Sequence, residues 1–411
     1  MLKCGFFETD ITPPIGSSMP GGFADRISTS IKDNLAAHAF AATDGSKTVI
    51  IISLDAIAIY SEDVEVIRNK ISSVTKVSPS NIFVAATHTH TAGPVINLYE
   101  TKRSQEYMNY LNSKAADAAV TAFNKMVPAK IGCDVVGVRG IAFNRRWIMA
   151  NGKARMNPPF DDPALVAPAD ITDPDFTVVR VDHEDGTPMG IITNFALHPA
   201  GLPGTEISAN YPGYMKKLIK NHYGYDFGFV FLTGCCGNIN FTDFAHSQRH
   251  SYDEPGKALA EAAIKLYDTI ITSGDCSIKS TSEYVTADIR VPTEKELEAA
   301  KNPIQREMRI GMEMGGGQVE CEVQTISIGD LSITGLPGEI FCVFGLHIKM
   351  GSPFKYNIVS ELTNGSNGYI YTREARQLGG YEALPSSYIR LDEETGYKFV
   401  NTAIKNLRSM K

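Results

Sequence analysis

Residues 49–59 read VIIISLDAIAI, the most apolar run in the chain, and residues 81–87 read NIFVAAT. Both runs are too short to cross a bilayer and fit strands that are covered on both faces. Between them, Ser61 and the acidic residues after it predict a helix that has Ser61 as its N-cap and ends near Val74. A strand, a helix and a second strand with short connections are typical of a βαβ unit, so the predicted fold class is α/β.

The rest of the chain extends this pattern. Further strands are predicted at residues 129–138, 176–182, 189–197, 228–232 and 331–336. Further helices are predicted at residues 104–126, 211–222, 254–271, 294–314, 340–350 and 392–409. No repeat, low-complexity tract or linker divides the sequence, which predicts one domain over residues 1–411, with a mixed β-sheet core flanked by helices. The longest predicted loop, residues 156–174, has the length of a functional lid or wall.

Composition narrows the class of partner. The formal net charge is -7 and no block of Lys and Arg occurs, so neither a nucleic acid nor an anionic membrane is an expected partner. A small-molecule substrate is expected instead. The first residues show no charged leader followed by an apolar stretch, so we expect a cytoplasmic protein. The sequence leaves the oligomeric state open.

The cysteines predict no disulfide framework. There are 7 of them, an odd number, and they are scattered without a C-x-x-C pair. Cys235 and Cys236 follow a predicted strand, where small thiols are usually part of the core rather than nucleophiles.

Three histidines carry the first chemical signal. His88 and His90 in THTHTAGP and His198 in NFALHPAG come directly after predicted buried strands, where ligand sites of open α/β sheets gather. In an extended segment, a His-x-His pair points both imidazoles to one side, and convergent imidazoles suit zinc. Each histidine alone also fits a hydrogen-bonded core position, and no H-E-x-x-H motif is present. Spacing therefore leaves the metal site and the core reading both open.

A series of short motifs resembles a known family. In chain order they are DITPP, THTHTAGP, FNRR, NFALHP, SANYPGY, TGCCGNIN, GLPGE, GYIYTREA and GGYE. The series is similar to the catalytic, N-terminal domain of the neutral, non-lysosomal ceramidases and runs from about residue 5 to about residue 385. The resemblance implies a hydrolase with one Zn²⁺ per chain.

The resemblance also implies roles for single residues. His88, His198, Glu339 and Tyr369 correspond to the zinc ligands, and His90 faces the substrate or the reaction centre. Without the family, Glu339 reads as an acid in the first turn of a helix and Tyr369 as a half-buried aromatic side chain.

Two further residues correspond to family positions near the metal. Arg145 falls where the family has an arginine that holds an oxyanion or a polar substrate group, and Tyr381 falls on a family tyrosine. The alternative for Arg145, beside Arg146 and Trp147, is a surface charge packed on an aromatic ring.

The chain departs from the family at the nucleophile. Ceramidases attack the amide with the serine of a Gly-Asp-Val-Ser-Pro element, and this chain has Asn240 at the serine position and Asn238 at the aspartate position. An asparagine amide cannot serve as an acyl nucleophile. Asn210 replaces another family aspartate, and the immunoglobulin-like domain that follows the catalytic domain in ceramidases has no counterpart in the sequence. These differences predict a substrate other than ceramide.

Our sequence-based hypothesis is therefore a zinc-dependent hydrolase that cleaves the carbon–nitrogen bond of a small soluble amide with metal-bound water. In it His90 or Tyr381 transfers protons, Arg145 holds the developing oxyanion and Asn240 donates a hydrogen bond to the substrate. One alternative is an esterase or lactonase, and another is a lyase or isomerase acting on a sugar derivative. A third is a non-catalytic member of the family that only binds a ligand.

Overall fold

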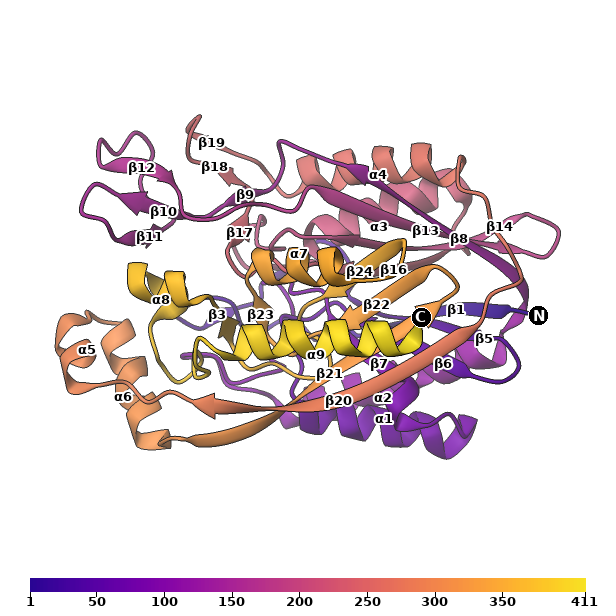
Figure 1. Ribbon diagram of the computed structural model, residues 1–411, viewed down its shortest axis with the longest axis horizontal. Coiled ribbons are helices and arrows are strands. Elements are labelled where there is room, and N and C mark those ends of the chain that lie inside the picture. The colour runs from indigo at the N-terminus through magenta and orange to yellow at the C-terminus, as the bar shows by residue number, and fades with distance from the viewer.

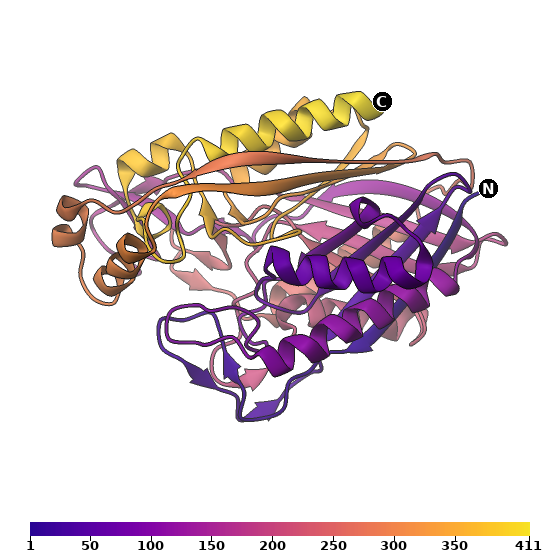
Figure 2. The ribbon, with the colours of Figure 1, turned by 90° about the horizontal axis from the view of Figure 1, so that it is seen from below.

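The computed structural model describes residues 1–411, and its core is two β-sheets stacked between two layers of helices (Figure 1 and Figure 2). The larger sheet has eight strands, in the spatial order β16 (Gly228–Thr233), β14 (Pro188–Phe195), β13 (Asp175–His183), β8 (Val127–Gly137), β1 (Lys3–Asp10), β5 (Ala36–Thr43), β6 (Thr48–Leu54) and β7 (Ile82–Ala86). The pairs β6–β7 and β14–β16 are parallel and the others are antiparallel, which confirms the predicted mixed sheet of an α/β protein.

The smaller sheet has four strands, in the order β20 (Ile278–Ile289), β21 (Gly317–Ile328), β22 (Leu331–Gly335) and β24 (Tyr356–Ser360). Its inner face packs on the larger sheet. Phe40 and Val230 of the larger sheet share one apolar cluster with Ile326 and Ile358 of the smaller sheet. Both sheets therefore bury one face in a common core.

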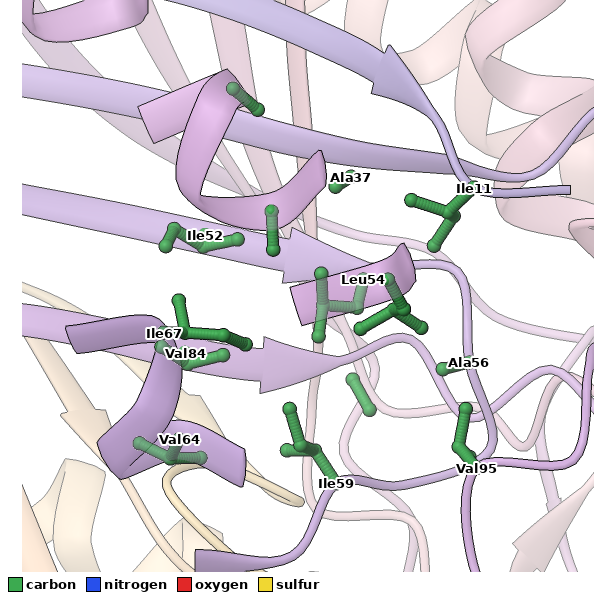
Figure 3. Packing of buried hydrophobic residues seen from close by; sticks show 14 of the residues in the cluster. Ile11, Ala37, Ile52, Leu54, Ala56, Ile59, Val64, Ile67, Val84 and Val95 are labelled. Atoms are coloured by element: carbon green, nitrogen blue, oxygen red, sulfur yellow. The ribbon is translucent and has the colours of Figure 1, made fainter. Parts of the chain in front are cut away.

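Helices cover the two outer faces. On the larger sheet these are α1 (Ser61–Thr75), α2 (Gln105–Asn124), α3 (Asn210–Tyr223) and α4 (Asp253–Tyr267), and on the smaller sheet α7 (Cys342–Gly351) and α9 (Thr395–Met410). Val64 and Ile67 of α1, one helical turn apart, pack on Ile52 of β6 and Val84 of β7 (Figure 3). Figure 1 shows α9 lying along β20 and β21.

Short elements complete the fold around the functional site. They are β2 (Ser18–Met19), β3 (Arg26–Ile27), β4 (Ser30–Ile31), η1 (Pro79–Asn81), β9 (Phe143–Asn144), β10 (Arg146–Met149), β11 (Ala154–Met156), β12 (Leu165–Pro168), β15 (Glu206–Ile207), β17 (Ile239–Asn240), β18 (Thr242–Asp243), β19 (Gln248–Arg249), α5 (Glu294–Ala299), α6 (Ile304–Met314), β23 (Glu339–Ile340), β25 (Tyr369–Ile370), α8 (Arg373–Leu378) and η2 (Tyr381–Ala383). None of the helices combines the length and the apolar character that a membrane crossing requires.

The predicted βαβ unit is confirmed as β6, α1 and β7, with two differences at its junctions. The first strand ends at Leu54 rather than at residue 59, because the buried segment that follows turns out of the sheet. The N-cap prediction is wrong: Ser61 is already helical, and the N-cap is Tyr60, which makes no side-chain capping bond.

Two other expectations are corrected. The single helix at residues 294–314 is wrong, because the chain forms α5 and α6 with Pro303 between them. A proline lacks the N–H of a continuous helix and its ring crowds the preceding turn. The long loop at residues 156–174 is partly ordered, since β12 pairs with β10. Strands β1, β5, β20, β21 and β24 of the two sheets were not predicted.

Candidate metal centre and active-site cavity

Three imidazoles meet at the carboxyl ends of two strands of the larger sheet. His88 and His90 follow β7, and His198 follows β14. The Nε2 atom of His198 lies 2.9 Å from that of His88 and 3.0 Å from that of His90, and the His88 and His90 Nε2 atoms are 3.3 Å apart. His88 has a φ of 68°, so the pair does not follow the two-residue period of a strand. The left-handed turn still brings both rings to one point.

Backbone carbonyls fix the proton positions on two of these rings. The Nδ1 of His88 lies 2.7 Å from the Ile57 carbonyl oxygen, and the Nδ1 of His90 lies 3.1 Å from that of Gly21. A carbonyl oxygen only accepts, so each Nδ1 carries the proton and donates. In the neutral rings the two Nε2 atoms then face each other with lone pairs, an arrangement that a cation between them stabilises.

Glu339 adds a carboxylate to the same point. Its Oε2 lies 3.2 Å from the His88 Nε2 and 4.0 Å from the His198 Nε2, while its Oε1 accepts a 2.8 Å hydrogen bond from the Tyr388 hydroxyl. Glu339 lies in β23 directly opposite Tyr369 in β25, so the reading of Glu339 as a first-turn helix residue is wrong. Oε2 is buried and accepts no hydrogen bond, which leaves one oxygen free for another partner.

The electrostatics of the group show that it does not hold three protonated rings. Burial and the neighbouring His88 lower the pKa of His90 to about 3 and lower the pKa of His198 well below its usual value. Burial opposes a charge on His88, but the Glu339 carboxylate outweighs it and raises the His88 pKa. In turn His88 holds the pKa of Glu339 at about 2 despite burial. A single positive charge is therefore enough to balance the Glu339 carboxylate, and the atoms around that charge are electron-pair donors.

The residues fit a metal ion. His88, His90 and His198 form a buried group whose nitrogen atoms all lie within 4.8 Å of one another. Bonds of 2.0–2.1 Å in a tetrahedral zinc site place neighbouring ligand atoms roughly 3.3 Å apart. The separations among the three Nε2 atoms and between His88 and Glu339, 2.9 to 3.3 Å, are close to this value, and the His198 Nε2 lies 4.0 Å from the Glu339 Oε2. The unpaired Glu339 oxygen supplies the anionic ligand that such a site commonly includes.

Arg145 lies beside this group and is not a surface residue. Its Nη2 donates to the Tyr369 hydroxyl at 3.0 Å and to the Gly237 carbonyl at 2.8 Å, and its Nε donates to Glu382 at 2.9 Å. Arg146 is also buried and donates to the second Glu382 oxygen at 2.6 Å. The reading of Arg145 as a surface charge is therefore wrong. Glu382 holds both guanidinium groups in place under the cavity.

A cavity of about 580 Å³ opens onto the group. His90, His198, Tyr369 and Tyr381 line it, whereas His88 does not. The segment from Met156 to Phe160 forms one wall, as expected for a functional loop. The Tyr381 hydroxyl is hydrogen-bonded to that of Tyr99, which also lines the cavity. All four predicted catalytic residues, His90, Arg145, Asn240 and Tyr381, are thus brought to one surface.

Asn240 is fixed in the cavity wall by its own amide. Its Nδ2 donates to the Asn157 side chain at 2.7 Å, and its Oδ1 accepts from the Thr242 N–H at 2.9 Å. Asn238 is also fully used, since it donates to Asp170 at 3.0 Å and accepts from the Cys342 N–H at 2.9 Å. Both asparagines hold the wall together at the positions where the sequence departs from the ceramidase motif.

Several residues of the site were not found from the sequence. Glu361 follows β24, is fully buried and accepts hydrogen bonds from the N–H groups of Cys236 and Ile340 at 3.0 and 2.8 Å. Its Oε1 also lies 2.9 Å from the Cys236 sulfur, which is 3.9 Å from the His198 Nδ1. Burial raises the pKa of Glu361 to about 7 and the pKa of the Cys236 thiol well above its usual value. The predicted core role of Cys236 is confirmed.

The rule that located the histidines, a polar residue directly after a buried strand, could also have located Glu361. This residue directly follows β24, which ends in NIVS. Tyr388 and Glu382 have no such signal, because Glu382 lies in the short helix η2, Tyr388 lies in an irregular segment, and neither directly follows a strand. Only the folded structure places them against Glu339 and Arg145.

The sequence comparison now assigns the family. Residues 2–226 match the family model described as neutral/alkaline non-lysosomal ceramidase, N-terminal. The chain belongs to this ceramidase family. The matched part contains His88, His90, Arg145 and His198, whereas Asn240, Glu339, Tyr369 and Tyr381 lie beyond it. No functionally curated protein matches the sequence.

Two solved structures share the ceramidase fold. Neutral ceramidase from Pseudomonas aeruginosa superposes with a TM-score of 0.78 at 16% identity, covering 100% of this chain and 74% of that chain. A ceramidase complexed with C2 gives a TM-score of 0.76 at 15% identity, with 100% and 75% covered. At this identity the likeness establishes the fold.

Proposed function

We propose that this member of the ceramidase family is a zinc-dependent hydrolase that cleaves the carbon–nitrogen bond of a small soluble amide. The observation that carries the proposal is the convergence of three imidazole Nε2 atoms at the edge of a cavity, with a free Glu339 oxygen 3.2 Å from the His88 Nε2. Nitrogen and carboxylate donors at these separations suit zinc. The shared apolar core of the two sheets further supports a single working domain.

In this proposal His88, His198, Glu339 and Tyr369 hold the ion, and His90 faces it from the cavity side. His88 and Glu339 lie behind the cavity surface, as structural ligands would, whereas His90 lines the cavity. Burial raises the pKa of Tyr369 well above its usual value, and the positive charge of Arg145, which donates to the Tyr369 hydroxyl oxygen, acts in the opposite direction. His90 has its Nδ1 on the Gly21 carbonyl and keeps its Nε2 for a proton or for the ion.

When bound, a zinc ion supplies a Lewis acid that polarises a carbonyl and acidifies water. Hydrolysis adds the oxygen of one water to the carbonyl carbon, breaks the carbon–nitrogen bond and gives a proton to the leaving nitrogen. The Arg145 guanidinium lines the cavity and is placed to hold the carbonyl oxygen as negative charge develops. His90 takes a proton at Nε2, and Tyr381 lies on the same wall to donate one to the leaving group.

Asn240 is the reason for proposing a substrate other than ceramide. It lines the cavity at the position of the family serine, and its amide is engaged with Asn157 and Thr242. The remaining route needs no protein nucleophile, because activated water can attack the carbonyl directly. Asn240 then serves as a hydrogen-bond donor to the substrate or as part of the wall.

The test combines metal analysis with a substrate panel. We expect about one zinc per purified chain, and hydrolysis of acylated soluble amines to exceed that of a short-chain ceramide analogue. Turnover of esters or lactones alone would move the activity to the esterase alternative. Bound metal with no turnover of amide, ester or lactone would contradict catalysis and favour the binding alternative. No bound metal after zinc is supplied would overturn the proposal.

Two variants separate the assigned roles. His90→Ala should retain zinc and lose at least about 100-fold in kcat, as expected for a general base. Loss of zinc from this variant would instead make His90 a ligand. Asn240→Ala should lower kcat/KM by about tenfold or less, because one neutral hydrogen bond contributes that much. A complete loss of activity in Asn240→Ala would contradict the supporting role of this side chain.

A further inference from the structure

We propose that the substrate is an N-acylated amino acid with an apolar side chain, whose carboxylate is bound by Arg26 and Arg249. This inference rests on the proposed amide hydrolase and names the class of its substrate. Three arginines line the cavity, and no Asp or Glu side chain lines it. The chain as a whole has a net charge of -7, so this concentration of positive charge is local. A cavity of one sign attracts a ligand of the opposite sign.

One of the three arginines is already engaged inside the protein. Arg145 donates at 2.9 Å to the buried Glu382, which it shares with Arg146, and also donates to Tyr369. It lies beside the proposed reaction centre. Arg26 and Arg249 are the cavity arginines that have no carboxylate partner.

Arg26 is half-buried and bonds only to carbonyl groups. Its Nη1 donates to Gly204 at 3.1 Å, and its Nη2 donates to Pro20 at 3.2 Å and to His90. Carbonyl oxygens orient a guanidinium without neutralising it. No carboxylate lies within 4.0 Å of Arg26, and its buried Nε has no hydrogen-bond partner. Burial lowers the pKa of Arg26, the direction expected of a desolvated cation that lacks a full counter-charge.

The nearest acid in sequence does not serve as that counter-charge. The two carboxylate oxygens of Asp25 accept hydrogen bonds from Ser18 at 2.7 Å and from Thr101 at 3.0 Å. Asp25 does not line the cavity. Arg26 is therefore held at the cavity wall by neutral groups, and its Nε–H and one Nη1–H have no partner.

Arg249 presents the second cation from the hairpin of β18 and β19. Its guanidinium carbon lies 5.2 Å from the centre of the Phe241 ring, which orients the exposed side chain along the cavity. Arg249 forms no ion pair. The acid on the facing strand, Asp243, is paired with His246 at 2.7 Å. The second guanidinium is thus free to bind a carboxylate.

The wall also carries large apolar side chains. The large side chains that line the cavity away from the metal group are Phe23, Met156, Phe160, Phe241 and Phe244. Apolar walls with a few fixed polar groups are typical of small-molecule sites. Together with two arginines they fit a ligand that has an apolar side chain and a carboxylate, and Arg favours the planar carboxylate geometry.

The test compares N-acetylphenylalanine with N-acetylphenylalaninamide, which differ in charge and share the scissile bond. On the zinc-loaded protein we expect the carboxylate to have at least about a tenfold higher kcat/KM and to bind more tightly by calorimetry. Arg249→Gln should reduce this preference about three- to tenfold, mainly through KM, and Arg249→Lys should restore part of it. Arg26→Gln should reduce it as well. High salt should weaken the preference in the wild type.

Arg155→Gln is the matched control. Arg155 is an exposed arginine on β11 that pairs with Asp162 at 3.7 Å and does not line the cavity. The control removes the same charge, so its preference should equal that of the wild type. Any direct contact between the substrate carboxylate and zinc would be the same in every variant, so it does not affect the comparison between variants.

The outcomes separate the substrate class from the proposed function. Equal hydrolysis of both amides, or a preference unchanged by Arg249→Gln and Arg26→Gln, would overturn the inference and leave the hydrolase intact. Absence of any hydrolysis, with tighter binding of the carboxylate that depends on Arg249, would support the inference and reject the hydrolase. A clear preference for N-succinylbenzylamine, which carries its carboxylate on the acyl side, would overturn the amino-acid class. Tighter binding of phenyl phosphate than of N-acetylphenylalanine would overturn the assignment of a carboxylate as the group that the arginines bind.

Discussion

His38 and His88 are both buried, His38 within β5 of the larger sheet and His88 just after β7 of the same sheet. Their ring nitrogens lie beside different groups. In β5, the Nδ1 of His38 lies 3.1 Å from Glu8 and its Nε2 lies 3.2 Å from Asp55. One imidazole there lies between two carboxylates. In the group of His88, His90 and His198, three imidazoles lie together beside one carboxylate, that of Glu339. The Oε2 atom of Glu339 accepts no hydrogen bond.

The difference lies in the charges beside each ring. Around His38, a carboxylate lies within 3.2 Å of each ring nitrogen, and Asp55 also accepts from the Ala36 N–H at 2.9 Å. Around His88, three imidazole Nε2 atoms lie within 3.3 Å of one another beside a single carboxylate. The first arrangement is an ion-pair group within the sheet, and the second could hold a metal ion. Substitutions in the two groups should therefore affect different measurements.

The largest expected effect is that of His88→Ala on the metal. Loss of a ligand should cost more than the 10- to 100-fold that outer partners contribute, so we expect zinc affinity and kcat/KM to fall by more than about 100-fold. Metal content by mass spectrometry and the amide assay measure the two losses. Normal zinc content in His88→Ala would contradict the site.

His38→Ala should act on stability and leave the metal in place. Removing one member of a buried charged group costs about 3–5 kcal/mol of unfolding free energy, and here Asp55 loses its charged partner. Denaturant unfolding measures the change. Zinc content and kcat should stay near wild-type values, since no His38 contact reaches the three-histidine group. A loss of zinc without a loss of stability would reverse the comparison.

These two groups also show how far the sequence allows prediction. His88, His90 and His198 were found because each follows an apolar strand, and strands of the larger sheet deliver them to one edge. Glu339 and Tyr369 were assigned only through the family resemblance. Their pairing between β23 and β25 joins segments 30 positions apart, which no local pattern reveals.

The missed parts have physical reasons as well. β5 reads AAHAFAAT, and its many alanines gave no strand signal, so His38 was not placed. β20 carries mostly polar side chains on its exposed face, which hid its role as the outer strand of the smaller sheet. The ion-pair partners of buried arginines, such as Glu382 for Arg145, depend on tertiary packing alone. Such contacts join residues that are distant in the chain.

Tyr388→Phe sharpens the comparison with a smaller effect. The Tyr388 hydroxyl donates to Glu339 Oε1 at 2.8 Å and so orients the free Oε2 towards the histidines. Removing such a partner of a ligand typically costs 10- to 100-fold in metal affinity, and we expect about tenfold. Competition with a zinc chelator measures it. The matched control is Tyr371→Phe, which removes a buried hydroxyl bonded to the Leu391 carbonyl and should leave zinc affinity unchanged.

The smallest expected effect is a pH dependence confined to the His38 group. Its two carboxylates raise the His38 pKa above the ordinary 6.5 despite burial, so its stabilising contribution is complete below pH 6.5 and is lost as the pH rises through the raised value. Burial opposes the charge on Glu8, but His38 and nearby lysines hold its pKa well below the ordinary 4.5, so its contribution is complete above pH 4.5 and is lost under more acidic conditions.

The difference in unfolding free energy between the wild type and His38→Ala should therefore be greatest between pH 4.5 and 6.5 and smaller at pH 9. Measuring both proteins without metal removes the titration of zinc ligands from the comparison. A difference that grows towards pH 9 would mean that His38 is held as a neutral ring, and the contrast with the metal group would then rest on hydrogen bonding rather than on charge.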